Sequence, residues 1–355
     1  MKTVVIFGYG LAGKIFHGQL LNSVAGFEVI GILTGNDERV FQAKSDFPHA
    51  LVSNDLDALL DLNPDLVVVA GANVTHVPHS QAALSRGINV VIDKPIAANA
   101  QAVAELGELA HANGVAVLPF QNRRWDSDYL ALKATVDSGT IGTPHRFESR
   151  LERFRLVPKG DWRELNDPEA LGGVLYDFAP HLVDQALDLM GPVVSVNAHA
   201  RTVREIPVSD DDLLIILQHE SGGLSYLVGS LATALPGPRF TLAGTKGALR
   251  INDLDTQEKH LKLGEIPGDG WGIESAESTV EIWSSDAAGE LTHSTLPFEI
   301  GNWPEYYREV LAFLTESVLP TVSLGQAVAT TRVLDAARIS VANGEVVCLE
   351  PPATH

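Results

Sequence analysis

Three side chains in this sequence have the chemistry needed to hold an oxygen and to exchange a proton with it. Lys94 follows the apolar run 89–92, in the segment Asp93-Lys94-Pro95. Asp177 and His181 are four residues apart, so one helical turn would place both on the same face. An imidazole with a pKa of about 6.5 suits proton exchange with a hydroxyl near neutral pH. Each residue also has a simpler interpretation, namely an exposed lysine at a strand end and a paired histidine on a helix.

A second group of residues forms a glycine-rich turn close to the N-terminus. The segment Gly8-Tyr9-Gly10-Leu11-Ala12-Gly13 follows an apolar run and precedes a stretch with helical spacing. In a G-x-G-x-x-G turn, Gly8 permits the tight turn, Gly10 lets a pyrophosphate approach the backbone, and Gly13 allows close helix–strand packing. The N-terminus of the following helix attracts anions. We therefore predict a dinucleotide site at residues 8–13, the alternative being glycines that only shorten a connection.

The end of the second apolar run bears on the choice between NAD and NADP. NAD enzymes usually place an acidic residue there to bind the ribose 2′-hydroxyl. Here the position holds Thr34, and Glu28 lies at the opposite end of the run. Arg39 is near enough in sequence to pair with a 2′-phosphate, although it could equally be a solvated helix residue. The pattern favours NADP, with NAD as the alternative.

The elements that must position these residues alternate between two periods over the first 120 residues. Apolar runs that predict strands occupy residues 4–7, 28–33, 66–70, 89–92 and 115–119. Helical spacing occupies residues 14–24, 55–62, 78–86 and 100–113, with Asn99 as the expected N-cap of the last helix. Strands that are apolar on both faces and separated by helices predict a doubly wound parallel sheet, a Rossmann fold. Ligands of such sheets bind at the carboxyl ends of the strands.

The segment after the fifth strand would lie at that carboxyl edge. Asn122, Arg123 and Trp125 could supply several donors and acceptors to a ligand with many hydroxyls. Arg123 could instead reach a cofactor phosphate, and Trp125 could instead pack between domains. Arg153, Phe154, Arg155 and Trp162 form another candidate rim.

The pattern changes after residue 120 to alternation with tight turns. Two hairpins are expected, at 213–218 with 224–231 and at 240–243 with 248–251, followed by helices at 304–318 and 326–342. This predicts an α+β domain with an open, mostly antiparallel sheet. We place the boundaries at 1–121 for the dinucleotide-binding domain and 122–355 for the substrate-binding and oligomerisation domain. The polar stretch 252–271 is expected to be a mobile loop.

Composition narrows the possible functions. The 355 residues carry a formal net charge of −20, which disfavours binding to nucleic acid and to anionic lipid. A single cysteine, Cys348, excludes an internal disulfide or a thiolate metal cluster. His76 and His79 have no evident third ligand, so we expect no metal. No run of about 18 apolar residues and no signal peptide is evident, so we expect a cytoplasmic protein without membrane contact.

The glycine turn, the Asp93-Lys94-Pro95 segment and Asp177-Phe178-Ala179-Pro180-His181 together resemble the Gfo/Idh/MocA oxidoreductase family over nearly the whole chain. The resemblance implies a Rossmann domain joined to an open sheet whose outer face commonly forms the subunit interface. It therefore implies a homodimer or homotetramer. The usual Glu-Lys-Pro of the family is Asp-Lys-Pro here, which leaves the lysine in place.

The resemblance also assigns roles to residues. Lys94 would hold or polarise the substrate, Asp177 would bind substrate hydroxyls and tune the base, and His181 would give or take the proton. Asn73 and His76 occupy the family's Asn-x-x-His positions and, with Lys94 and Pro95, would line the cofactor site. We expect the amino group of Lys94 and the imidazole of His181 to meet beside the nicotinamide.

Three further segments are similar to the NADP-dependent scyllo-inositol dehydrogenases: residues 121–128, residues 175–185 and Trp271-Gly272. Thr34-Gly35-Asn36 depart from the Ser and Arg often found there in that subgroup. The expected function is an NAD(P)-dependent oxidoreductase acting on the CH–OH groups of a polyol, with scyllo-inositol and a keto-inositol as the expected pair. The alternatives are a dehydrogenase or reductase of another sugar, and a non-catalytic dinucleotide-sensing regulator.

Overall fold

The computed structural model describes residues 1–158, 164, 171–205, 209–286 and 288–350, and the chain forms two compact units. The first unit comprises Met1–Trp125, Thr256–Trp271 and Asn302–Val328, and the second comprises Asp126–Asp255, Gly272–Gly301 and Ala329–His355. The expected single boundary between residues 121 and 122 therefore misses two segments that return to the first unit. They return because Trp303, Tyr306 and Tyr307 are buried in its hydrophobic core.

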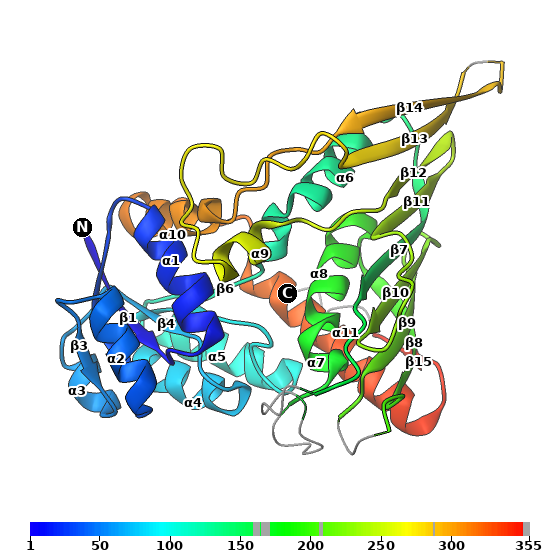
Figure 1. Cartoon of the computed structure of the whole chain (residues 1–355). Helices are drawn as coiled ribbons and strands as arrows, with labels where there is room; N and C mark the ends of the chain where they lie inside the picture. Colours follow the sequence, from blue (N-terminus) through cyan, green and yellow to red (C-terminus); the bar gives the residue numbers. More distant parts are fainter. Residues whose placement is uncertain (159–163, 165–170, 206–208, 287, 351–355) are drawn as a thin grey trace. The chain divides into compact units, whose positions relative to one another are not determined.

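The first unit is built on a six-stranded parallel sheet in the order β3-β2-β1-β4-β5-β6 (Figure 1). Its strands are β1 (Lys2–Phe7), β2 (Phe27–Leu33), β3 (Leu51–Ser53), β4 (Leu66–Val69), β5 (Asn89–Ile92) and β6 (Val117–Pro119). The expected doubly wound parallel sheet is confirmed. The short strand β3 was missed because two of its three residues are only partly buried and one is exposed.

Helices cover both faces of this sheet because β1 and β4 bury alternate side chains on opposite sides. Besides the helix that follows the glycine turn, the helices of this unit are α2 (Asp37–Asp46), α3 (Leu56–Leu60), α4 (Asn73–Leu84), α5 (Ala100–Ala112), α9 (Gln257–Lys262) and α10 (Pro304–Glu316). Asn99 caps α5 as expected, by accepting a hydrogen bond from the amide of Ala102. Helix α4 begins five residues before the expected start at Pro78, since an exposed proline removes only one helical hydrogen bond.

The helix after the glycine turn begins in an unusual form. Residues Ala12–Gly18 make a π-helix (η1), and α1 (Gln19–Ser23) continues from it. Gly18 fits this wide turn because an added Cβ would lie 3.0 Å from the carbonyl oxygen of Gly13. A turn that is widened in this way is rare and often occurs at functional sites.

The second unit contains a nine-stranded sheet in the order β14-β13-β12-β11-β7-β10-β9-β8-β15, antiparallel except for the β7–β10 pair. Its strands are β7 (Pro144–Glu152), β8 (Val193–Arg201), β9 (Asp212–His219), β10 (Leu224–Ser230), β11 (Phe240–Gly244), β12 (Gly247–Ile251), β13 (Thr279–Ser285), β14 (Leu291–Pro297) and β15 (Val347–Cys348). Both expected hairpins, β9–β10 and β11–β12, are confirmed.

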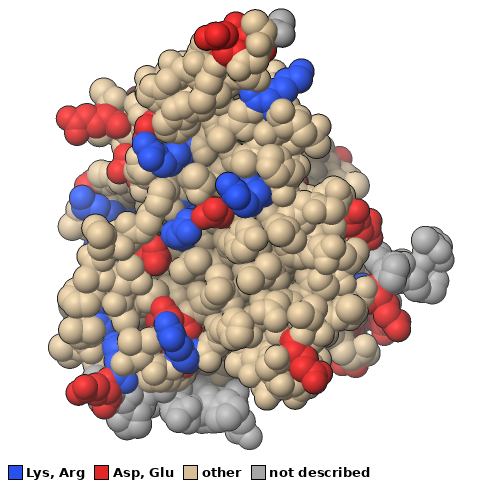
Figure 2. Space-filling model, turned by 90° about the vertical axis from the view of Figure 1, so that its right-hand side faces the viewer, with Lys and Arg blue, Asp and Glu red and all other residues tan. Residues whose placement is uncertain are grey.

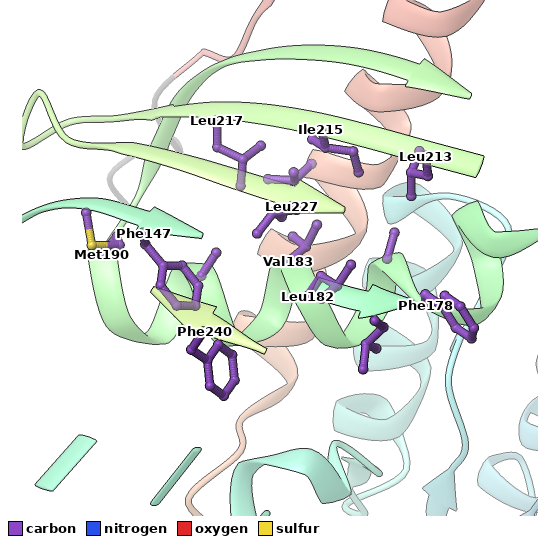
Figure 3. Close-up of a cluster of buried hydrophobic side chains, with 14 of the residues drawn as sticks. Phe147, Phe178, Leu182, Val183, Met190, Leu213, Ile215, Leu217, Leu227 and Phe240 are labelled. Atoms are coloured by element: carbon purple, nitrogen blue, oxygen red, sulfur yellow. The ribbon is translucent and has the colours of Figure 1, made fainter. Parts of the chain in front are cut away.

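One face of this sheet is covered by α6 (Ser127–Asp137), α7 (Val174–Asp177), α8 (Ala179–Met190) and α11 (Leu324–Asn343) (Figure 1). Figure 3 shows Leu182 and Val183 of α8 directed toward Ile215 of β9 and Leu227 of β10, where all four are fully buried. These contacts fix α8, and with it the backbone of His181, on the sheet.

The chain between β12 and β13 contains a helix where a loop was expected. The stretch 252–271, expected to be a mobile loop, contains α9, whose Gln257 and Leu261 are fully buried. The polar composition of this stretch is typical of a loop, but Gln257 is buried because its side chain forms hydrogen bonds and not because it makes apolar contacts. No helix in the described ranges is long and apolar enough to cross a membrane.

Candidate cofactor and substrate site

The glycine turn has the close contacts that its sequence predicts. Gly8 has φ +96°, and a Cβ there would lie 2.6 Å from the Cα of Gly71, in the turn after the neighbouring strand β4. A Cβ on Gly13 would lie 1.9 Å from the carbonyl oxygen of Gly8. A Cβ on Gly10 would meet only the guanidinium of Arg39, 3.8–3.9 Å away. The turn is thus closed on its inner side and open at Gly10, which fits the approach of a pyrophosphate.

Tyr9, expected to contact the cofactor, directs its side chain elsewhere. It is 1% exposed, and its hydroxyl donates to the Oδ2 of Asp46 in α2 at 2.8 Å. Burial raises the pKa of this hydroxyl, and Asp46 raises it further. Only the backbone of Tyr9 remains for a ligand, while the neighbouring Leu11 is exposed and Ala12 is buried.

Thr34 and Arg39 lie at the carboxyl end of β2. Thr34 is buried, and the Asn36 side chain caps α2 by accepting from the amide of Arg39 at 3.0 Å. This cap places an exposed Arg39 side chain against the open face of Gly10. Within the described part of the chain, the guanidinium of Arg39 makes no hydrogen bond or ion pair, so its charge is available to an anion.

Asn73 and His76, expected to line the cofactor site, lie in the first turns of α4. Both are buried, and the Nδ1 of His76 lies 2.8 Å from the carbonyl oxygen of Pro95. Its Nε2 lies 3.4 Å from the carbonyl oxygen of Gly71. Burial lowers the pKa of His76, against the opposing effect of Asp93. His76 therefore links the turn after β4 to the turn after β5.

Lys94 lies directly after β5, at the same edge of the sheet as the glycine turn. It is half-buried, and the Lys94–Pro95 peptide is cis. The amide of Lys94 donates to the Oδ1 of the preceding Asp93 at 2.7 Å. Burial alone would raise the pKa of Asp93, but His17, Lys94 and His76 together outweigh it and lower the pKa. A buried carboxylate therefore anchors the backbone of Lys94.

His17 was not singled out from the sequence, although it faces this carboxylate. Its Nε2 lies 3.8 Å from the Oδ2 of Asp93, and its Nδ1 lies 2.7 Å from the hydroxyl of Tyr307 in α10. The ring centroids of His17 and Phe120 are 4.2 Å apart. Tyr307 is 290 residues away in sequence, so no local pattern could indicate the contact.

Asn122, Arg123 and Trp125, expected to bind substrate, are all buried in the first unit. Arg123 pairs with Glu258 of α9, with 2.6 Å between Nη2 and Oε2. The ring of Trp125 packs edge-on against Tyr306, with 5.7 Å between centroids, and its carbonyl accepts from Gln257 at 3.0 Å. The structure thus gives Arg123 and Trp125 partners inside their own unit, and their binding of substrate stays a prediction.

In the second unit, Asp177 and His181 lie in two successive helices, α7 and α8, and not in one continuous helix as expected. The break falls at Phe178 because Pro180 has no amide hydrogen to continue the helical bonding. The amide of His181 still bonds to the carbonyl oxygen of Phe178 at 3.1 Å. His181 is 6% exposed, and Asp177 is half-buried.

The start of α7 is fixed by Asp210, another residue that was not singled out from the sequence. Its Oδ2 accepts from the amide of Leu175 at 2.8 Å, and its carbonyl oxygen accepts from the amide of Val174 at 3.0 Å. Gly173 has φ +84°, and a Cβ there would lie 2.1 Å from the Oδ1 of Asp210. Burial raises the pKa of Asp210 to about 6. Asp210 therefore caps the helix that carries Asp177.

The other candidate rim residues belong to the second unit. The guanidinium of Arg153 lies 5.4 Å from the ring centroid of Phe178, and Arg155 pairs with Glu164 at 2.9 Å. Phe154 is exposed. Trp162 lies outside the described residues. Because Lys94 belongs to the first unit and His181 to the second, their meeting beside a nicotinamide stays a prediction.

Both units of the chain match domains of a known protein family. Residues 2–120 match the oxidoreductase family with an NAD-binding Rossmann fold, and residues 129–250 match the GFO/IDH/MocA C-terminal domain. The chain is 33% identical to the uncharacterized oxidoreductase YdgJ of Escherichia coli, over 98% of each chain. It is 30% identical to the scyllo-inositol 2-dehydrogenase (NADP(+)) IolW of Bacillus subtilis, over 98% of this chain and 96% of that one.

A solved structure shows the same fold over nearly its full length. The yvaA protein of Bacillus subtilis superposes with a TM-score of 0.91 at 28% identity, covering 98% of each chain. Together with the matches to both family domains, this likeness accounts for the parallel sheet, the glycine turn and the mostly antiparallel sheet of the second unit. The chain belongs to the Gfo/Idh/MocA family of NAD(P)-dependent oxidoreductases.

Proposed function

We propose that this protein is an NADP-preferring dehydrogenase of a polyol, with a cyclitol such as scyllo-inositol and the corresponding keto-inositol as its substrate pair. The observation that supports the substrate class is the relationship to IolW, which extends over nearly the whole of both chains. The chemistry of Lys94, Asp177 and His181 suits a substrate with several hydroxyls, because each can bind or exchange a proton with one.

The residues that would hold the cofactor are those of the first unit. The open face of Gly10 would receive the pyrophosphate, and the N-terminus of the helix that follows would stabilise its charge. Asn73 and the backbone of the Lys94–Pro95 turn lie at the same edge of the sheet. When bound, the nicotinamide supplies the hydride in reduction and accepts it in oxidation.

The proposed roles of the chain's own residues concern the oxygen and its proton. Lys94 holds the reacting oxygen and stabilises negative charge on it. His181 takes the hydroxyl proton when the alcohol is oxidised and returns it when the ketone is reduced. Asp177 binds a neighbouring hydroxyl and orients the histidine.

The cofactor preference rests on Arg39, whose exposed guanidinium has no hydrogen bond or ion pair within the described residues and would pair with a 2′-phosphate. We expect Arg39→Gln to raise the KM for NADPH by about 10- to 150-fold, since hydrogen bonds to charged groups contribute roughly 1.5–3 kcal/mol. The KM for NADH should change less than about twofold. Lys44→Gln, on the exposed side of the same helix, is the matched control. An equal loss with both cofactors would contradict the NADP preference.

The substrate is tested with a panel of inositols and pyranose sugars, each assayed with NADP⁺ and with NAD⁺. The proposal requires the highest kcat/KM for a cyclitol with NADP⁺. A sugar that exceeds every cyclitol would replace the substrate class and keep the enzyme class. Absence of turnover with every polyol, in a protein that binds the dinucleotide, would favour the alternative of a dinucleotide-sensing regulator.

We also propose that a second copy of this chain covers the outer face of the nine-stranded sheet. Leu214 and Ile216 of β9 and Tyr226 and Val228 of β10 alternate with buried residues and are only partly covered. Figure 2 shows this face, on which most of the surface is uncharged and some of the charged groups lie next to groups of opposite sign. An apolar face of this kind suits a self-complementary interface.

Ile216→Glu tests this interface, because it places a charge at the centre of the partly covered strip. The variant should elute as a monomer in size-exclusion chromatography with light scattering, while the parent chain elutes as a dimer or tetramer. Phe41→Glu, which changes an apolar residue that is 77% exposed in the first unit, is the control and should leave the mass unchanged. A parent chain that is monomeric at micromolar concentration would overturn this part of the proposal.

A further inference from the structure

A buried series of polar groups connects α10 to the backbone of Lys94. The hydroxyl of Tyr307 lies 2.7 Å from the Nδ1 of His17, and the Nε2 of His17 lies 3.8 Å from the Oδ2 of Asp93. The Oδ1 of Asp93 accepts from the amide of Lys94 at 2.7 Å. All these groups belong to the first unit. We refer to Tyr307, His17 and Asp93 as the His17 series.

The His17 series occupies a place where apolar side chains would pack at lower cost. The side chains of His17 and Tyr307 are 0% exposed, and Phe120 and Tyr306 pack around them. Burying an imidazole and a carboxylate is unfavourable unless each is paired and hydrogen-bonded. The π-helix η1 carries His17 at its sixth position, so an unusual backbone turn presents the imidazole.

The geometry of Asp93 indicates what the series does. One carboxylate oxygen accepts from the amide of Lys94, and the other faces the Nε2 of His17 at 3.8 Å, a polar contact that is longer than a hydrogen bond. The terminal torsion of an aspartate is soft, so the bond to the Lys94 amide holds the carboxylate less firmly when no polar group faces its second oxygen. The direction of the Lys94 backbone therefore depends on both contacts.

We propose that His17 is a positioning residue for Lys94 and acts on it through Asp93. This inference rests on the role of Lys94 in the proposed function. Loss of the imidazole would release the carboxylate, loosen the Lys94 amide and displace the amino group. Because a displacement of about 1 Å in an active site can cost roughly 100-fold in rate, the effect should be much larger in kcat than in cofactor binding, for which the glycine turn would supply most of the contacts.

The test compares two amide substitutions that each retain one half of the imidazole. His17→Gln places an amide near the position of Nε2, toward Asp93, and His17→Asn places one near Nδ1, toward Tyr307. We expect His17→Gln to keep kcat within about fivefold of the parent, and His17→Asn and His17→Ala to lower it by about 10- to 100-fold. The Kd for NADPH, measured by fluorescence, should change by less than about threefold in all three.

A second readout does not depend on the substrate. In full-length protein labelled with ¹⁵N-lysine and free of ligand, the exchange rate of the Lys94 amide with solvent reports its bond to Asp93. We expect this rate to rise at least about tenfold in His17→Ala and His17→Asn and to stay near the parent value in His17→Gln. His79→Ala, which removes a different half-buried imidazole of the same unit, should leave it unchanged.

These readouts separate the inference from the proposed function. If the parent turns over no polyol, the proposed function fails, and the Lys94 amide still decides whether His17 positions it. An unchanged Lys94 amide in both His17→Asn and His17→Ala would overturn the inference. So would a His17→Gln variant whose Lys94 amide exchanges as fast as that of His17→Asn. If His17→Ala does not fold, the comparison of Gln with Asn carries the test alone.

Discussion

Asp93, a buried carboxylate of the first unit, and Asp210, a half-buried carboxylate of the second, perform the same local task with opposite electrostatic outcomes. Each accepts a backbone amide, that of Lys94 at 2.7 Å and that of Leu175 at 2.8 Å. Each thereby fixes the backbone beside a candidate catalytic residue, Lys94 or Asp177. Yet the pKa of Asp93 is lowered, while that of Asp210 is raised to about 6.

The difference comes from the partners and not from burial, since burial raises the pKa of both. Asp93 faces His17 and has Lys94 and His76 nearby, and these interactions more than offset its desolvation. Among the described residues, no lysine, arginine or histidine pairs with Asp210, and Asp211 beside it adds a like charge. One anchor therefore remains a carboxylate through the neutral range, and the other takes up a proton in mildly acidic solution.

The largest effects are expected at Lys94 and His181, the two residues that are proposed to act on the reacting oxygen and its proton. Lys94→Met and His181→Asn should each lower kcat/KM for the polyol by about 1,000-fold, because each removes a group that acts on the reacting oxygen or its proton. If both act on one substrate, the double variant should lose far less than the product of the two. Steady-state kinetics of the four proteins measure this.

A matched control for these variants is Lys133→Met, which breaks the 2.7 Å ion pair of Lys133 with Asp188 in the second unit. This change should leave kcat/KM within about twofold, because surface ion pairs contribute little. Fully multiplicative losses in the double variant would mean that Lys94 and His181 act independently, against the proposed mechanism.

The next largest effect should be a difference in kcat between variants of Asp93 and Asp210. Asp93→Asn retains an acceptor for the Lys94 amide but removes the charge that faces His17, so we expect kcat to fall by about 100-fold. Asp210→Asn retains the acceptor for Leu175 and removes a charge that no cation compensates, so kcat at pH 7.5 should stay within about threefold. Equal losses in the two variants would show that their electrostatic settings do not matter for the reaction.

The sequence indicated Lys94 and Asp177 as candidate catalytic residues, but it could not indicate the groups that fix the backbone beside them. Lys94 and the glycine turn are local signals, since the strand, the turn and the helix that they need are adjacent in the chain. The contacts of His17 with Tyr307 and of Leu175 with Asp210 join residues 290 and 35 positions apart, and no short pattern records them. Pro180 is a local signal for the break between α7 and α8, because proline lacks the amide hydrogen that would continue the helical bonding.

The same reasoning explains which parts of the fold were predicted. The parallel sheet followed from continuous apolar runs such as Leu66–Val69, and the hairpins followed from glycine turns between alternating strands. The return of α9 and α10 to the first unit was missed, because it depends on Gln257, which accepts from Trp271 and Trp303 at 2.7 and 2.8 Å. A polar residue buried through such bonds resembles a loop residue in sequence.

Asp210 should also make the stability of the protein depend on pH in a defined direction. Its pKa is about 6 in the folded protein and 3.8 ordinarily, so between these values the folded state holds a proton that the unfolded state has lost. The stabilisation from protonated Asp210 is complete below about pH 4 and is lost as the pH rises through about 6.

Asp210→Asn cannot lose a proton, so this part of the pH dependence should vanish in the variant. Relative to the parent, the free energy of unfolding of Asp210→Asn should rise by roughly 1.5 kcal/mol between pH 5.0 and 7.5. Urea unfolding of both proteins at the two pH values measures it. A constant difference between them at both values would mean that Asp210 does not titrate near pH 6.

The smallest effect is expected at the far end of the His17 series. Tyr307→Phe removes one hydroxyl from a fully buried ring and leaves the Nδ1 of His17 without its 2.7 Å contact. Loss of one buried hydrogen bond should lower the free energy of unfolding by about 1 kcal/mol, while kcat should fall only about two- to fivefold because the contact of His17 with Asp93 is retained. Urea unfolding and steady-state kinetics test both values. A loss of kcat as large as that of Asp93→Asn would place Tyr307 itself in the chemistry, and the contrast between the two carboxylates would then no longer account for the reactivity of Lys94.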